Sequence, residues 1–175
     1  LLVNGEVQFN YQYAVSELLV VEAGSGFTYK YPVTDFWFDY DYDADARDVK
    51  TQPTFMLGIK VFPDEDAYDD GSYFGLQMNH RQYASTVTLN SNYSTLKMED
   101  SKSFLDFGFL YGYHMLAWGD DLVIDYYLGL ALRTVFREQP ESTYSTDPTQ
   151  SEYEIVSYED KTVALLLVIK VGYNF

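Results

Sequence analysis

Apolar and polar residues alternate along most of the chain with a period of two, and a helical period of 3.6 is nearly absent. This pattern predicts an all-β chain, because successive side chains of a strand point to opposite faces. One face of each predicted strand is large and apolar, whereas the other mixes glycine with charged and amide side chains. Seven long strands are expected, at residues 6–15, 18–31, 54–62, 73–89, 103–117, 122–137 and 165–175.

Glycine recurs on the polar face of these strands. In a water-soluble sandwich that face would meet solvent, where Lys and Glu are favoured over Gly. Glycine inside strands instead marks places where backbones come close. The pattern therefore favours a crowded interior, a narrow lumen lined by charges and amides. The glycines in question are Gly24, Gly26, Gly58, Gly75, Gly108, Gly112, Gly129 and Gly172.

The connections between the strands alternate in length. Short ones are expected at 14–17, 63–72 and 118–121, and long ones at 32–53, 90–102 and 138–161. Such alternation is typical of up-and-down membrane barrels, which have short periplasmic turns and longer outer loops. Bacterial single-chain barrels normally have an even number of strands. We therefore expect an eighth strand before the first visible one, with Leu1–Gly5 as its end and turn and the N-terminus trimmed.

The C-terminal strand places apolar side chains on one face up to the final aromatic residue: Leu165, Leu167, Ile169, Val171, Tyr173 and Phe175. It resembles the closing strand of bacterial outer-membrane β-barrels, whose terminal Phe is read by the barrel-assembly machinery. Residues 5–16 resemble the opening hairpin of small Bacteroidota-type outer-membrane barrels of OmpA/OmpX-like architecture. The resemblance implies one transmembrane barrel domain over residues 1–175, an outer-membrane location, contact with lipid, and an assembly signal at Phe175, Tyr173 and Val171.

Composition agrees with a membrane barrel without requiring one. Aromatic residues make up 18% of the 175 residues, including 18 Tyr, which suits two membrane–water interfaces. A Tyr-rich soluble β-sandwich is the alternative. The longest apolar run, Val163–Ile169, is far shorter than the about 18 residues of a helical span. The net charge of −16 argues against nucleic acid as a partner, and without cysteine the fold has no disulfides.

Charged residues on the polar face fall at two depths. Glu22, Lys60, His114, Asp125 and Lys170 are expected near the short-turn end. The remaining cations are expected higher, near Asp106 or Glu6: Arg81, Arg133 and Arg137. One interpretation is a general-base histidine with a carboxylate that orients it. A paired charge network that plugs a narrow barrel is favoured, since each unpaired buried charge costs several kcal/mol.

Other candidate chemistry is weaker. Asp41, Asp43 and Asp45 have the spacing of the start of a calcium loop, but the sixth and twelfth positions are Ala and Gln. An exposed acidic loop is therefore favoured. With two histidines, a multi-histidine metal site is nearly excluded. His80 and Ser85 should point to opposite sides of a regular strand, against a lipid-modifying pair. No cofactor and no metal site are expected.

The sequence thus predicts an eight-stranded, antiparallel, up-and-down transmembrane barrel in a Gram-negative outer membrane. Its expected function is non-enzymatic, as a structural or accessory component of a larger envelope assembly that acts through its outer loops. A small pore, a lipid-modifying enzyme and a soluble lipocalin-like binder remain as alternatives. Eight strands enclose an interior only wide enough for side chains, which disfavours the pore.

Overall fold

The computed structural model describes residues 6–29, 47–64, 67, 69–91, 94–117, 122–144 and 151–173. In these ranges all regular secondary structure is β-strand. None of the described residues forms a helix that is long and apolar enough to cross a membrane. The strands are β1 (Glu6–Ser16), β2 (Leu19–Thr28), β3 (Arg47–Lys50), β4 (Gln52–Val61), β5 (Gly71–Ser91), β6 (Ser94–Ala117), β7 (Leu122–Tyr144) and β8 (Ser151–Tyr173).

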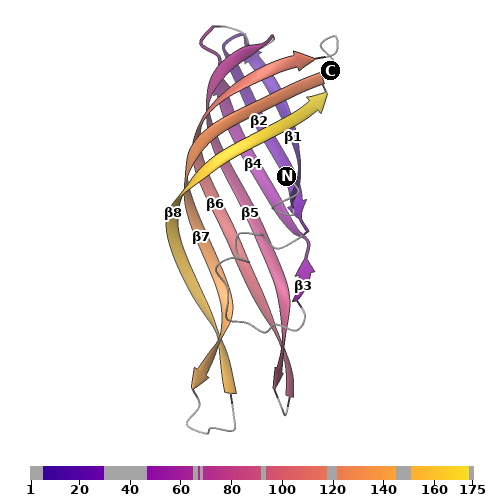
Figure 1. Cartoon of the computed structure of the whole chain (residues 1–175), viewed down its shortest axis with the longest axis vertical. Helices are drawn as coiled ribbons and strands as arrows, with labels where there is room; N and C mark the ends of the chain where they lie inside the picture. The colour runs from indigo at the N-terminus through magenta and orange to yellow at the C-terminus, as the bar shows by residue number, and fades with distance from the viewer. Residues whose placement is uncertain are drawn as a thin grey trace.

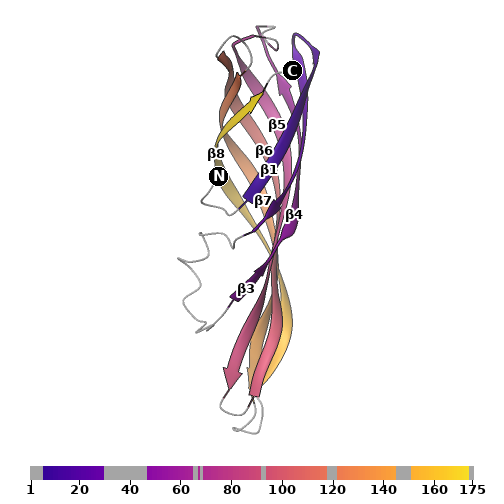
Figure 2. The ribbon, with the colours of Figure 1, turned by 90° about the vertical axis from the view of Figure 1, so that its right-hand side faces the viewer.

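The strands form one antiparallel sheet in the order β1-β2-β4-β5-β6-β7-β8, with the short β3 paired to β5. Consecutive long strands are neighbours, so the predicted all-β, up-and-down arrangement is confirmed. In Figures 1 and 2 the sheet is strongly twisted, and its upper part curls around an interior. Among the described strands the sheet does not close, because β1 and β8 are its two edges and do not pair with each other.

The eighth described strand is not the one that the sequence predicts. β3 lies within the predicted long connection 32–53, and its four residues pair with β5 at Ala84–Val87. The predicted eighth strand would precede β1, and Leu1–Gly5 lies outside the described residues. The seven long strands themselves agree with the seven predicted from the alternation.

Two other predicted long connections, 90–102 and 138–161, are wrong, because both are largely strand. β5 pairs with β6 at every residue of β5, and β7 pairs with β8 along the whole length of both strands. The sequence of these segments resembles that of loops, because it is rich in polar residues and lacks a long apolar face. A hairpin in water needs no such face to extend, since its main-chain groups are satisfied by the partner strand.

The sheet has two distinct ends. At one end, which we call the turn end (top of Figure 1), lie the β1–β2 turn, the last residues of β4 and β6, and the first residues of β5 and β7. The β5–β6 and β7–β8 hairpins project in the other direction, to what we call the hairpin end. β8 finishes at the turn end, because its last residue pairs with the first residue of β7.

The convex and concave faces of the curved sheet have opposite character. On the convex face, ten apolar side chains that the alternation places outward are 53% to 79% exposed: Phe9, Tyr11, Phe55, Leu57, Phe109, Tyr111, Leu128, Leu130, Leu167 and Ile169. On the concave face, Lys60 and Asp125 are 2% and 1% exposed. The apolar residues therefore point outward, as predicted, and the charges are buried.

Close packing on the concave face explains part of the glycine pattern. A Cβ atom on Gly112 would lie 2.5 Å from the Tyr73 ring, and one on Gly129 would lie 2.6 Å from the carbonyl oxygen of Phe109. Both contacts are too short for a real side chain. Glycine is thus required at these two positions, where a side chain or the main chain of a neighbouring strand comes too close for a Cβ atom.

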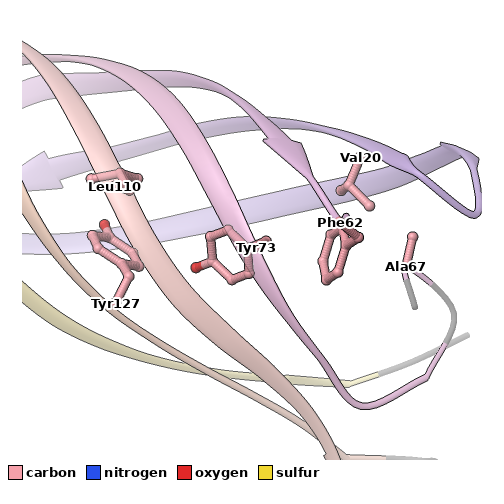
Figure 3. Close-up of a cluster of buried hydrophobic side chains, with 6 residues drawn as sticks. All are labelled: Val20, Phe62, Ala67, Tyr73, Leu110 and Tyr127. Atoms are coloured by element: carbon pink, nitrogen blue, oxygen red, sulfur yellow. The ribbon is translucent and has the colours of Figure 1, made fainter. Parts of the chain in front are cut away.

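A small apolar cluster occupies the interior toward the turn end (Figure 3). Its members are Val20, Phe62, Ala67, Tyr73, Leu110 and Tyr127. Two residues after β4 lie against the β1–β2 turn: the Phe62 amide donates to the Leu18 carbonyl at 2.8 Å, and the Ala67 amide donates to the Glu17 carbonyl at 2.9 Å. Phe62 and Ala67 are thereby held in the cluster beside the β1–β2 turn.

Candidate functional site

The predicted charges near the turn end lie together in the interior. We call Glu22, Lys60, Asp125 and Lys170 the turn-end layer; they come from β2, β4, β7 and β8. The Lys60 ammonium contacts the Asp125 carboxylate, and its Nζ lies 3.8 Å from Oε2 of Glu22. Lys170 donates to Oε1 of Glu22 at 2.6 Å. Strands that are distant in the sheet are thereby joined across the interior.

Two polar residues that the sequence did not single out complete this layer. The Tyr73 hydroxyl donates to Oδ1 of Asp125 at 2.6 Å, and Lys60 lies over the Tyr73 ring at 4.7 Å. Gln12 donates from Nε2 to Asp125 and to Glu22, at 3.4 Å each. Gln12 alternates with the outward apolar side chains of β1, so its direction could be predicted but its partners could not.

His114 lies at the same depth without joining the ion pairs. It is buried, stands directly opposite Asp125 in the β6–β7 register, and meets the Phe62 ring edge-on with centroids 6.1 Å apart. Its Nδ1 has no hydrogen-bond partner among the described residues. A general base would need an orienting partner within about 2.6–3.2 Å, and none of the described hydrogen bonds supplies one.

A second group of charges, nearer the hairpin end, forms what we call the hairpin-end layer: Glu6, Arg81, Asp106 and Arg133. Arg133 donates to both oxygens of Asp106, at 2.7 and 2.8 Å, and Arg81 contacts the same carboxylate. Nη1 of Arg81 lies 4.0 Å from Oε2 of Glu6, which also accepts from Thr54 at 2.9 Å through its other oxygen. A carboxylate that binds two guanidinium groups is well satisfied.

Arg137, which the sequence places with this group, lies four residues further along β7 and is half-buried. It stands opposite Lys102 on β6 and Tyr158 on β8. The contacts described around Asp106 involve Arg81 and Arg133. Arg137 therefore lies closer to the hairpin end than the hairpin-end layer does.

Each layer balances its charges. The turn-end layer has two lysines and two carboxylates, and the hairpin-end layer has two arginines and two carboxylates. Breaking one such buried pair leaves an uncompensated charge and is strongly destabilising. Each of the two layers is therefore a neutral, paired network, and the large negative charge of the chain lies outside them.

The residues considered for other chemistry do not assemble into a site in the described structure. Ser85 is fully buried on the concave side, whereas His80 is half-exposed on the other side of β5. No group of three or more His, Asp or Glu residues there is arranged to hold a metal ion. Asp41, Asp43 and Asp45 lie outside the described residues.

The predicted assembly signal is only partly within the described chain. Tyr173 and Val171 are 60% and 67% exposed on the convex face. Phe175 lies outside the described residues, so its role stays a prediction.

Two exposed glutamates on the hairpins, Glu99 and Glu141, have a lowered pKa. The Lys50 ammonium hydrogen-bonds to Glu99 and holds the pKa of that carboxyl below its usual value, which joins β3 to β6. Hydrogen bonds from the Tyr158 hydroxyl and from Gln139, the latter at 2.9 Å, lower the pKa of Glu141 in the same way. The polar hairpins are thus tied together by side-chain contacts as well as by the sheet.

No protein-family model, curated protein or solved structure matches this chain. Any function must therefore be argued from the chain's own residues. The strongest feature for that purpose is the burial of charge inside a sheet whose outer surface is apolar.

Proposed function

We propose that the chain is a β-barrel protein of a Gram-negative outer membrane, with a non-enzymatic, accessory role. The observation that carries this proposal is the inverted distribution of side chains. Outward residues such as Leu167 are 79% exposed, whereas Lys60 and Asp125 are buried. In water this arrangement would expose a large continuous apolar surface, which monomeric soluble proteins avoid. In a lipid bilayer it places each class of side chain in its preferred environment.

The height of the apolar surface supports a membrane span. On β8 the outward side chains from Val163 to Tyr173 are all apolar or aromatic. These ten steps at about 3.3 Å each extend about 33 Å along the strand, and a tilt of about 40° reduces this to a height of about 25 Å. The apolar band of outer-membrane barrels has about this height.

Tyrosines gather where the turn end would meet the interface. Tyr13, Tyr126 and Tyr173 are exposed on the convex face near that end, and the rings of Tyr113 and Tyr126 stack with centroids 5.7 Å apart. Tyr and Trp are enriched at membrane–water interfaces because one end of the ring is apolar and the other polar. The turn end would accordingly lie at one interface, and its short β1–β2 turn favours the periplasmic side.

The hairpins would then project from the outer surface. β5 to β8 each have 21 to 24 residues, although about 9–11 suffice to cross the bilayer. Their remaining length is polar and carries ion pairs such as Lys50–Glu99. We propose that these projecting hairpins are the surface through which the barrel joins a larger envelope assembly. Outer-membrane lipid and, through β8, the barrel-assembly machinery are its other proposed partners.

A pore is the second candidate, and the interior argues against it. The two ionic layers and the apolar cluster between strands fill the curved sheet with paired side chains. We expect planar-bilayer recordings of the purified protein to show no steady ohmic conductance. A reproducible open channel would favour the pore over the accessory role.

Fractionation of cells that express the protein tests the membrane proposal. We expect the protein in the outer-membrane fraction, soluble only after detergent extraction, and migrating differently on a gel before and after boiling. A closed barrel resists detergent until it is heated, whereas a soluble sandwich or lipocalin-like binder stays in the aqueous fraction. Recovery in that aqueous fraction would refute the proposal.

A further inference from the structure

The projecting part of the β7–β8 hairpin is a two-stranded ribbon. β6 pairs with β7 as far as Ser101 and Glu138, whereas β7 and β8 stay paired beyond that row, to Tyr144 and Ser151. The two hairpins accordingly diverge toward the hairpin end (Figure 1). A two-stranded hairpin on its own is marginally stable in water, and a third strand usually stabilises it. The projecting ribbon is therefore a place where an added strand would contribute stability.

Of the two edges of this ribbon, the edge formed by β8 is the one that can accept an antiparallel strand freely. A strand inserted between β6 and β7 would be parallel to one of them, because these two run in opposite directions. Among the described strands, β7 is the neighbour of β8, and the other side of β8 is open. We call residues 154–162 of β8 the outer edge. Under the proposed function, on which this inference rests, they lie beyond the apolar series that begins at Val163, and their main-chain groups face water.

The outer edge is acidic. Three carboxylates and one ammonium give it a net charge of −2: Glu154, Glu159, Asp160 and Lys161. Nζ of Lys161 lies 3.3 Å from Oε1 of Glu159, so this pair on the convex face is satisfied. Glu154 and Asp160 are exposed on the other face, and neither forms an ion pair with another described residue. Glu141 of β7 stands directly opposite Glu154. Like charges in that position repel each other, so a cation on an added strand would relieve the repulsion.

The same charges disfavour a second copy of the chain as the added strand. Antiparallel pairing of two outer edges centred on Ser157 would place Glu154 of each copy opposite Asp160 of the other. Like charges directly opposite are destabilising, and charged side chains on an edge are one means by which proteins prevent such self-pairing. Glu154 and Asp160 are six residues apart on one face of the strand. A segment that carries two cations at this spacing would be attracted instead.

We propose that the outer edge binds an extended, basic segment of another envelope protein by antiparallel strand addition. The segment carries Lys or Arg at two positions six residues apart, opposite Glu154 and Asp160. An apolar residue of the segment lies opposite Ile155, which is 51% exposed on the other face. In strand addition the main-chain hydrogen bonds supply affinity and the alternate side chains supply selectivity. The outer edge is thus the contact through which the projecting hairpins join the assembly.

Disulfide capture of synthetic peptides by the protein in lipid vesicles tests this proposal, since the chain has no cysteine. Ser157→Cys places a thiol on the outer edge. Ser101→Cys is the matched control, because Ser101 and Ser157 flank Glu138 in one row, and β6 is paired on both sides there. The probe is a threonine-rich peptide of nine residues that would pair with 154–162, with lysine third and ninth, valine eighth, and an activated cysteine sixth, opposite position 157. Yields are normalised to the reaction of each variant with a small neutral disulfide.

We expect at least about tenfold more capture at Ser157→Cys than at Ser101→Cys, because only the former lies on an open edge. Glutamate in place of both peptide lysines should lower the yield at Ser157→Cys by about threefold to tenfold, the usual effect of losing two exposed ion pairs. Adding Glu154→Gln and Asp160→Asn to Ser157→Cys should do the same. Two further peptides are N-methylated on their odd or even amides. Successive N–H groups of a strand point to opposite sides, so one of these two should lose capture and the other should keep it.

Equal capture at the two cysteines, capture that does not depend on charge, or equal yields from the two methylated peptides would overturn the proposal. A disulfide between two copies of the Ser157→Cys variant, formed in preference to peptide capture, would identify a second copy as the occupant and would overturn it as well. Heat-modifiable migration of the same samples reports separately on the membrane barrel. Its absence would refute the proposed function, whereas its presence without capture would refute the outer-edge contact alone.

Discussion

Replacement of Asp125 by asparagine perturbs the turn-end layer most directly. The Asp125 side chain is 1% exposed and binds the Lys60 ammonium and the Tyr73 hydroxyl. Asparagine keeps the shape but removes the charge. Among the described residues, the carboxylate that Lys60 then retains is Glu22, at 3.8 Å, and Glu22 is already bound to Lys170. We expect the free energy of unfolding to fall by about 3–5 kcal/mol, the usual cost of leaving one buried charge without its partner.

Urea titration of the protein refolded into lipid vesicles measures this loss, with the folded fraction read from unboiled gel migration. Removing both charges, as Lys60→Met with Asp125→Leu, should recover most of the loss, because an apolar pair of similar volume replaces a buried ion pair at little cost. Glu99→Gln is the matched control, since its ion pair with Lys50 is exposed and should contribute little. If Asp125→Asn unfolds at the parental urea concentration, the proposed role of the layer is refuted.

Three further predictions concern the lipid surface, assembly and the hairpins. Leu128→Arg should cost about 2–4 kcal/mol near mid-membrane, while Ser157→Arg on the projecting part of β8 should be nearly neutral in the same urea titration; equal effects would contradict a lipid-facing Leu128. Deletion of Phe175 should slow insertion in cells more than refolding into pure lipid, because burial of one aromatic ring is worth only about 1.5–3 kcal/mol; equal losses would show that no receptor reads it. The Lys50–Glu99 contact lowers the pKa of Glu99, so its stabilisation is complete above the ordinary glutamate pKa and is lost as the pH falls through the lowered value. A carboxyl ¹³C titration by NMR should give a midpoint below that of an ordinary glutamate, and a normal or raised midpoint would argue against the contact.

The alternation of the sequence predicted which face each residue occupies, and this was enough to place the charges inside. Lys60, Asp125 and Lys170 all lie on the concave face, at the depth inferred by counting from the turns. The specific partners could not be predicted. Whether Lys60 meets Asp125 or Glu22 depends on the curl and tilt of the whole sheet, which bring β4 opposite β7. A period of two contains no information on that curvature.

The hairpins were missed for a different reason. A polar, Ser- and Thr-rich segment such as 138–161 resembles a loop, because strands are recognised in sequence by their apolar face. Here the pairing of β7 with β8 continues without one. The short β3 was missed as well, since its four residues are held by a neighbouring strand rather than by their own pattern. In both cases pairing with a neighbouring strand, and not the local sequence pattern, determines that the segment is a strand.

The central claim is that the convex face of the sheet contacts lipid. Spin labels at successive positions from Val163 to Val171 on β8, in vesicles, test it most directly. Labels at the outward positions, such as Leu165 and Leu167, should be accessible to oxygen dissolved in the bilayer and protected from a water-soluble nickel chelate. Labels at the intervening positions should be protected from oxygen, which gives a period of two. Free access of the nickel chelate to Leu165 and Leu167 would contradict the membrane barrel.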